Sequence, residues 1–328
     1  MIVDVHAHVI VPEITRAAGD DAWRPDVRWE GGEQIVTYAG RSIRSAVHEF
    51  VRVDEMMREA LGWGVEGLVL SPWVALLPDA PDLDDSLRIC RIQNAALAAL
   101  ARAHPGRIRA LGAVPLHHPD AAAAELRASM AEGGLCGVEV PASVRGDYLG
   151  DDRFLPFWEA AADTGAVVFV HPTTRGFELP VFEGYYLWNT VANPMETAVT
   201  GAHLVMAGVL ERFPGLRIVL AHGGGALASV RGRLRRAHAF QPQARERLQE
   251  PPDVSLQRLY FDTVTHDAEL LRSLIDWVGA DRVLLGSDRP FDMGTDRPVE
   301  EVRALGLTPE DEAHVLGGNA ERLIGGFG

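Results

Sequence analysis

The sequence predicts a (β/α)8 TIM-like barrel with a small β insertion after its first strand. Eight short apolar runs rich in β-branched residues are spread over the chain of 328 residues. Longer segments with helical periodicity separate most of these runs, and this alternation predicts a parallel sheet. The runs are continuously apolar, as expected for strands that are covered on both faces. A doubly wound open sheet is the alternative, but no Gly-x-Gly-x-x-Gly motif follows the first run.

The predicted elements follow one another in a regular order. The strands are expected at residues 2–5, 65–70, 108–114, 137–140, 166–170, 217–220, 259–261 and 283–286. The clearest helices are expected at residues 85–103, 119–132, 154–164, 196–207, 225–236 and 268–278. Because eight strand–helix units are the number that closes a barrel, we favour the closed form over an open sheet.

Two long connections interrupt this repeat. Residues 15–50 are polar and rich in Trp, Gly and Arg, and contain three short alternating pieces at residues 27–29, 35–38 and 41–43. Such pieces predict a small β excursion. A second connection, residues 173–193, follows the fifth strand and carries aromatic residues typical of a pocket wall. We therefore expect one domain, residues 1–328, in which residues 15–50 form a lid over the catalytic end.

The composition excludes several classes of function. A net charge of −15 repels phosphate backbones and anionic membranes, so no nucleic-acid or membrane partner is expected. All basic residues are arginine, which excludes a Schiff-base lysine, a Walker lysine and a carbamylated lysine between two metals. The two cysteines are too few for a disulfide framework. With no apolar span or targeting segment evident, we expect a cytoplasmic protein.

Polar side chains stand at the carboxyl ends of four predicted strands. His6 and His8 end the first strand, and residues two apart on a strand point to the same face. His171 follows the fifth strand, His222 the sixth and Asp288 the eighth. A single buried histidine is often only a hydrogen-bonded core residue. Because barrel enzymes place their active sites at this rim, the five groups together indicate a catalytic site.

The types of residue suggest one divalent metal ion. Imidazoles and a carboxylate suit zinc, with a position left for water, whose pKa the metal lowers toward about 7. His6, His8, His171 and Asp288 would hold the ion, and His222 would move protons. Without lysine for a carbamate, and without a spare acidic residue in an evident bridging position, one metal is expected rather than two. No organic cofactor is implied.

These side chains lie in five short motifs. They are His6-x-His8, Val-His171-Pro172, Ala-His222-Gly-Gly-Gly-Ala, Gly-Ser-Asp288-Arg-Pro-Phe291 and Gly-Asn319-Ala-Glu-Arg-Leu. With them the chain resembles the amidohydrolase superfamily over residues 1–323. Within it, the chain is similar to the branch of 2-amino-3-carboxymuconate-6-semialdehyde decarboxylase and related metal-dependent non-oxidative decarboxylases. The resemblance implies a barrel, a zinc ion on the four residues proposed above and a proton-transferring histidine at His222.

The resemblance also implies residues that bind substrate. Arg44, on the insertion, matches an arginine that binds the substrate carboxylate, a suitable partner for a planar guanidinium. Asn189 lies in the segment that lines the pocket, and Phe291 closes the motif after the last strand. Arg233 matches an arginine that reaches the neighbouring subunit's site, which implies a homodimer; a solvated basic helix face is the alternative. Asn189 and Arg289 replace a tryptophan and a tyrosine of the semialdehyde decarboxylase.

The sequence therefore predicts a metal-dependent carboxy-lyase for an unsaturated or aromatic carboxylate. Either metal-activated water adds first, with Asp288 taking its proton, or His222 protonates the carbon directly. Zinc is the expected metal and manganese the alternative. A hydrolase of an amide, lactone or cyclic imide, or a hydratase, could use the same site. A barrel that only binds a small acid or a metal would not need the proton-transferring histidine.

Overall fold

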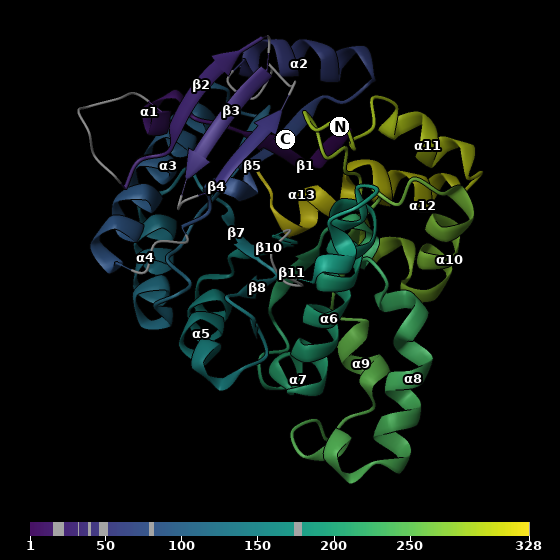
Figure 1. Cartoon of the computed structure of the whole chain (residues 1–328). Coiled ribbons are helices and arrows are strands. Elements are labelled where there is room, and N and C mark those ends of the chain that lie inside the picture. The colour runs from purple at the N-terminus through teal and green to yellow at the C-terminus, as the bar shows by residue number, and fades with distance from the viewer. Residues whose placement is uncertain are drawn as a thin grey trace.

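The main sheet of the protein has the predicted eight parallel strands. The computed structural model describes residues 1–15, 23–31, 33–38, 41–45, 52–78, 82–173 and 179–327. The strand order is β1-β5-β6-β7-β10-β11-β12-β13 (Figure 1). The strands are β1 (Val3–Val9), β5 (Gly67–Pro72), β6 (Ile108–Gly112), β7 (Gly137–Pro141), β10 (Val167–His171), β11 (Arg217–Leu220), β12 (Tyr260–Asp262) and β13 (Val283–Leu284). All eight predicted strands are confirmed.

The chain after β13 returns to β1 and closes the sheet. The Asp288 N–H donates to the carbonyl of His6 at 2.8 Å, and the His8 N–H donates to the carbonyl of Arg289 at 2.7 Å. Ala7 also forms a parallel bridge with Arg289. Closure of this kind satisfies the free edges of the sheet. The predicted barrel is therefore confirmed, and its closure brings Asp288 next to the histidines of β1.

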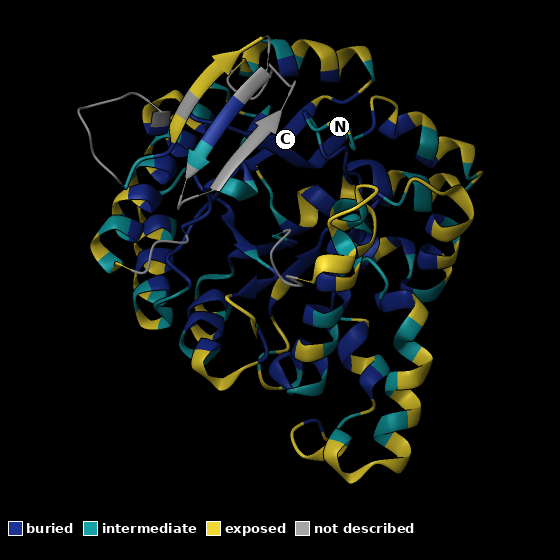
Figure 2. Cartoon of the chain, in the orientation of Figure 1, coloured by how far each residue is buried: buried dark blue, intermediate teal, exposed yellow. Residues whose placement is uncertain are grey.

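Helices surround the barrel, and Figure 2 shows buried strands inside and helices that mix buried with exposed residues around them. The longer ones are α2 (Val53–Gly62), α3 (Leu83–Ala103), α4 (Pro119–Glu132), α5 (Leu155–Thr164), α6 (Asn193–Met206), α8 (Leu227–Phe240) and α10 (Ala268–Val278). The shorter ones are α1 (Pro12–Thr15), α7 (Val209–Arg212), α9 (Pro252–Leu256), α11 (Pro298–Ala304), α12 (Pro309–Ala313) and α13 (Asn319–Leu323). All six predicted helices are confirmed, with ends shifted by a few residues. No helix in the described ranges is long and apolar enough to cross a membrane.

The insertion after β1 forms its own small sheet. Strands β2 (Asp26–Glu30), β3 (Glu33–Tyr38) and β4 (Arg41–Ser45) pair antiparallel in that order. The predicted β excursion is thus confirmed, while its action as a lid stays a prediction. Two further strands, β8 (Ser143–Val144) and β9 (Asp147–Tyr148), form a hairpin after β7.

A bulge in β1 turns its histidines into the barrel. The pairing of β1 with β5 shifts register in the middle of the strand. Val5 packs in the apolar cluster inside the barrel, whereas Ala7 packs in the cluster between sheet and helices. In a regular strand these two residues would share a face. Because the bulge reverses the alternation, His6 and His8 face the interior at its carboxyl end.

Candidate metal centre and active site

Four of the predicted residues lie around one point at the carboxyl ends of the strands. His6, His8, His171 and Asp288 each offer one ligand atom, and these atoms lie within 4.8 Å of one another. The Nε2 atoms of His6 and His8 are 3.1 Å apart. Oδ1 of Asp288 lies 3.2 Å and 3.3 Å from these two nitrogens. All four residues are buried. The fold therefore brings together, from three strand ends, the set that the sequence proposed.

The donor atoms of this group suit a divalent cation. Nε2 of His171 and Oδ1 of Asp288 are buried and form no hydrogen bond within the described ranges. Buried polar atoms rarely lack a partner, so each such atom needs an explanation. Three imidazole nitrogens and one carboxylate oxygen around one point are ligands that zinc accepts and that other divalent metals share. A cation at this point would supply the missing partner.

The far side of each imidazole is held by an acceptor. Nδ1 of His6 lies 2.6 Å from Oδ2 of Asp262. Nδ1 of His171 is 2.8 Å from the carbonyl of Pro172, and Nδ1 of His8 is 3.2 Å from a backbone carbonyl. Because carbonyl and carboxylate oxygens only accept, each ring carries its proton on Nδ1. The Nε2 atoms then face the centre, where a metal ion would take the place of a second proton on the ring.

The charges around the centre favour a cation there. Burial would lower the pKa of His8, but the charge of Glu139 and the contact with Asp288 raise it to about 9. Burial would raise the pKa of Asp288, but the imidazoles, His6 first, hold it well below its usual range. Burial and the neighbouring imidazoles lower the pKa of His171 far below its ordinary value. His171 is thus a neutral ring with a lone pair available.

His222 lies beside this group without belonging to it. Its Nε2 atom is 3.2 Å from Oδ2 of Asp288, the oxygen that faces away from His6. Its side chain is 17% exposed, whereas the His6 and His8 side chains are fully buried. Since the carboxylate can only accept, the His222 Nε2 carries the proton of this hydrogen bond. A partly exposed ring with such a proton has the geometry of a general acid.

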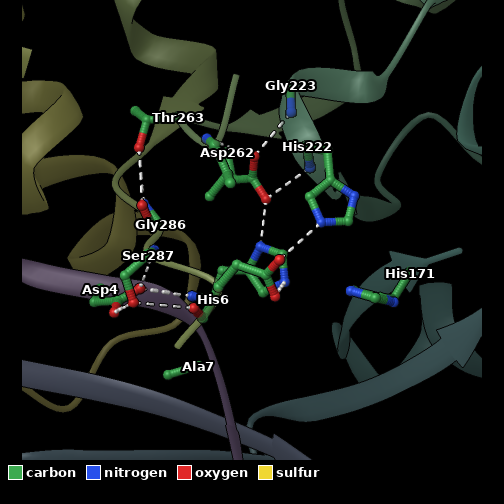
Figure 3. Close-up of polar contacts among 12 residues, drawn as sticks. Asp4, His6, Ala7, His171, His222, Gly223, Asp262, Thr263, Gly286 and Ser287 are labelled. Atoms are coloured by element: carbon green, nitrogen blue, oxygen red, sulfur yellow. Dashed lines mark hydrogen bonds and ion pairs between the residues drawn. The ribbon is translucent and has the colours of Figure 1, made fainter. Parts of the chain in front are cut away.

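The backbone of His222 is strained and is held by a carboxylate. His222 and Asp288 have φ of 57° and 58°. This left-handed conformation costs about 1–2 kcal/mol in residues other than glycine and is typical of functional sites. Asp262 accepts hydrogen bonds from the His222 and Gly223 N–H groups at 2.9 Å and 2.8 Å (Figure 3).

Glycines shape the turn that follows His222. Gly223, Gly224 and Gly225 all have positive φ, and a Cβ on Gly225 would lie 2.0 Å from the carbonyl of Pro194. The glycine run after the sixth strand is therefore a tight turn that only glycine can form, and α8 begins beyond it.

The residues proposed for substrate binding lie around this centre at different distances. The Phe291 ring packs edge-on against His8, with centroids 5.1 Å apart. Asn189 is half-buried in the π-helical turn Trp188–Ala192. Within the described ranges, its side chain forms no hydrogen bond to the metal centre. Arg233 is exposed on α8. The backbone of Arg44 belongs to β4, but its side chain lies outside the described residues.

Three buried carboxylates near the centre were missed in the sequence: Asp4, Glu139 and Asp262. Asp4 accepts from the N–H and the hydroxyl of Ser287, next to Asp288, and burial raises its pKa to about 6. Glu139 on β7 lies 3.6 Å from Nδ1 of His8. Asp4 and Glu139 are charged residues inside otherwise apolar strands, and this pattern could have identified them.

Arg289, which follows Asp288, turns away from the centre. Its guanidinium lies 3.3 Å from Glu59 on α2 and stacks over Trp63 at 5.1 Å. The replacement of a tyrosine by arginine at this position therefore places no guanidinium at the centre, although the residue is adjacent to Asp288 in the sequence.

The fold and the buried His/Asp group together define a barrel protein with a candidate metal centre at its catalytic rim. Residues 74–326 match the amidohydrolase family, and the chain belongs to that family. It is 28% identical to 2-amino-3-carboxymuconate-6-semialdehyde decarboxylase of Dictyostelium discoideum, over 84% of this chain and 76% of that protein. It is also 28% identical to the gamma-resorcylate decarboxylase of Rhodococcus jostii, over 79% of this chain and 83% of that protein.

Solved structures share the whole fold. The 5-carboxyvanillate decarboxylase of Sphingomonas paucimobilis superposes with a TM-score of 0.82 at 23% identity, covering 98% of both chains. A dihydroxybenzoic acid decarboxylase of a Polaromonas species, solved with bound manganese and the inhibitor 2-nitroresorcinol, gives 0.80 at 21% identity, covering 98% of this chain and 96% of that one. These likenesses confirm the barrel, and the curated relatives named above are carboxy-lyases.

Proposed function

We propose that this protein is a metal-dependent non-oxidative decarboxylase for an aromatic or unsaturated carboxylate. The observation that carries the proposal is the group of four buried ligands with His222 hydrogen-bonded to one of them. The family and the activities named for its relatives support the same reaction. Hydrolysis or hydration on the same centre is the second candidate, because the ligand set alone suits these reactions as well.

His6, His8, His171 and Asp288 would hold one divalent ion. We propose zinc as this ion, with manganese as the alternative. When bound, it would supply a Lewis acid that polarises substrate oxygens and stabilises the negative charge left as carbon dioxide departs. Bound manganese in the Polaromonas decarboxylase supports the alternative metal. No organic cofactor is part of the proposal.

The protein's own residues would bind the substrate and move its proton. As the bond to the carboxyl carbon breaks, its electron pair stays on the ring or alkene carbon, and the proton on Nε2 of His222 forms the new C–H bond. Asp288 holds that proton in place until then, through Oδ2. Arg44 would bind the substrate carboxylate, and Phe291 and Asn189 would line the pocket. If water adds first, Asp288 takes its proton.

Product analysis tests this function directly. Zinc- or manganese-loaded protein is incubated with hydroxylated benzoates, unsaturated dicarboxylates, cyclic amides and lactones, and the products are analysed by mass spectrometry. We expect at least one carboxylate to lose carbon dioxide, and chelator-treated protein to leave it unchanged. Gain of water by an amide, lactone or alkene, with every carboxylate intact, would instead establish a hydrolase or hydratase.

We further propose a cytoplasmic homodimer with shared active sites. Exposed apolar side chains gather in residues 179–195, where Tyr185 is 95% and Val181 67% exposed. Such a patch is typical of an interface. The π-helical turn of this segment and α8, which carries exposed Arg233, both pack against α6. A second copy seated on this side would cover the patch and bring a partner's arginine close. Both cysteines, Cys90 and Cys136, are free thiols, in keeping with a reducing compartment.

A mixing experiment tests the shared site. Arg233→Ala should lose at least about tenfold in kcat/KM, because a charge-assisted contact to a carboxylate is removed. Arg233→Ala protein is then mixed with an equal amount of a His222→Asn variant, and the two are allowed to exchange subunits. The mixture should have about a quarter of wild-type activity, because half of the dimers are then heterodimers with one intact site each. A mixture no more active than its separate components would exclude the shared site, and so would full activity in Arg233→Ala.

A further inference from the structure

Asp262, the last residue of β12, accepts four hydrogen bonds in a fully buried position. Its Oδ2 faces Nδ1 of His6 at 2.6 Å and the backbone N–H of His222 at 2.9 Å. Its Oδ1 accepts from the N–H groups of Gly223 at 2.8 Å and Val264 at 3.0 Å. Figure 3 shows this carboxylate between the two histidines. Two donors therefore face each oxygen.

The carboxyl group of Asp262 meets four donors and no acceptor among these contacts. A buried carboxylate with this many donors is a strong acceptor, because hydrogen bonds to an ionised group are shorter and stronger than neutral ones.

The first link runs from Asp262 to the metal centre. An acceptor at Nδ1 keeps the proton of His6 on that nitrogen and turns Nε2 toward Asp288, which lies 3.2 Å away. Among the three histidines of the group, His6 alone has a carboxylate within 3 Å of its Nδ1 atom. This contact therefore sets both the orientation of the ring and its strength as a ligand.

The second link runs from Asp262 to His222. His222 and Gly223 both have left-handed φ, of 57° and 60°, and both donate their N–H groups to this carboxylate. A strained histidine keeps such a backbone only where its surroundings fix it. The two hydrogen bonds thus hold the turn that directs the His222 ring to Asp288.

We propose that Asp262 is a positioning residue that couples the metal centre to the proton-transferring histidine. One carboxylate fixes Nε2 of His6 as a ligand atom and at the same time fixes the turn that carries His222. The coupling to turnover rests on the proposed function of His222, whereas the link to metal affinity does not. A carboxylate that served only to stabilise the turn would leave metal affinity unchanged.

The isosteric change Asp262→Asn separates these roles. An amide has one oxygen and one NH2 group, so in either orientation the NH2 group faces two donors. If it faces His6, the imidazole must move its proton to Nε2, the atom that a metal needs. If it faces Gly223 and Val264, the turn that carries His222 is released.

Zinc affinity is the first measurement, made on metal-free protein by competition with a chromophoric chelator and without any substrate. We expect Asp262→Asn to weaken zinc binding about 10- to 100-fold, as the loss of an outer partner of a metal ligand typically does. The control is Asp267→Asn, because Asp267 caps the N-terminus of α10 through Leu270 N–H and is exposed. Because Asn caps a helix about as well as Asp, this control should keep both thermal stability and zinc affinity close to wild type. Equal affinities in wild type and Asp262→Asn would overturn the proposal.

A double-variant cycle tests the link to His222. At saturating zinc, Asp262→Asn should lower kcat at least about tenfold in the wild-type background and have no further effect in the His222→Asn background. Equal losses in both backgrounds would mean that Asp262 does not act through His222. If no substrate is decarboxylated at all, the proposed function fails while the zinc result still stands.

The wild-type protein gives a readout that does not depend on how the variant folds. In zinc-loaded protein with 15N-labelled histidine, the NMR spectrum should show the Nδ1–H tautomer for His6, with a proton shifted far downfield by the carboxylate. A proton on Nε2 of His6 would overturn the proposal, since Asp262 would then not direct that nitrogen to the metal.

Discussion

Replacing His222 by Asn is expected to abolish turnover and leave metal binding intact. His222 is not one of the four ligands; its ring packs against those of His6 and His171, and its hydrogen bond to the group goes to Oδ2 of Asp288 at 3.2 Å. Loss of a general acid lowers kcat by about 10²- to 10⁴-fold. Asn is the right substitute because it tolerates the left-handed φ of 57° better than other residues. Its backbone N–H can still donate to Asp262, so the turn is kept.

The measurement compares kcat and zinc content of the purified variant with those of a matched control. His266→Asn provides that control, because His266 also follows a strand, has φ of 54° and is exposed. The control should retain wild-type kcat and one metal per chain. A His222→Asn protein with full activity would remove His222 from the mechanism, and one that had lost its metal would place it among the ligands.

The barrel and the His/Asp group could be predicted because both follow from local patterns. Strands covered on two faces must be apolar throughout, so each is visible as a short run in the sequence. Parallel closure then places all carboxyl ends at one rim, and a polar residue such as His171 or Asp288 within two residues of the end of a run must lie there. Residues two apart share a face, which paired His6 with His8 even though the bulge between Asp4 and Ala7 was not predicted.

The partners of the carboxylates behind the histidines could not be predicted in the same way. Asp262 comes directly after the predicted seventh strand, but its partners lie on β1 and after β11. These contacts depend on the register between strands, which local patterns do not fix. Arg289 also shows that local patterns do not predict contacts. It follows Asp288 directly in the sequence and yet pairs with Glu59 on α2. Neighbours in sequence need not share a site where the backbone turns.

The change Asp288→Asn is expected to remove both the metal and the activity. Asp288 is the carboxylate of the four-residue group, and its two oxygens face different partners: Oδ1 faces His6 and His8, and Oδ2 faces His222. An amide removes the negative charge that draws a cation to the group and gives one of these partners an NH2 group instead of an acceptor. The left-handed backbone, with φ of 58°, suits Asn as well as Asp. Activity should therefore fall at least about a thousandfold without unfolding the protein.

Asp288 is proposed both to bind the metal and to hold the proton of His222, and rescue by excess metal separates these two roles. His171→Ala also removes one ligand, but it leaves the hydrogen bond between His222 and Asp288 in place, so high zinc should restore part of its kcat. In Asp288→Asn the same zinc should refill the centre and restore little, because the charged carboxylate that holds the proton of His222 has become a neutral amide. Asp292→Asn, at an exposed carboxylate in the same loop, should keep wild-type metal content and kcat. Full rescue of Asp288→Asn by zinc would show that Asp288 serves the metal alone, and the proton held on His222 would then have to be placed by another group.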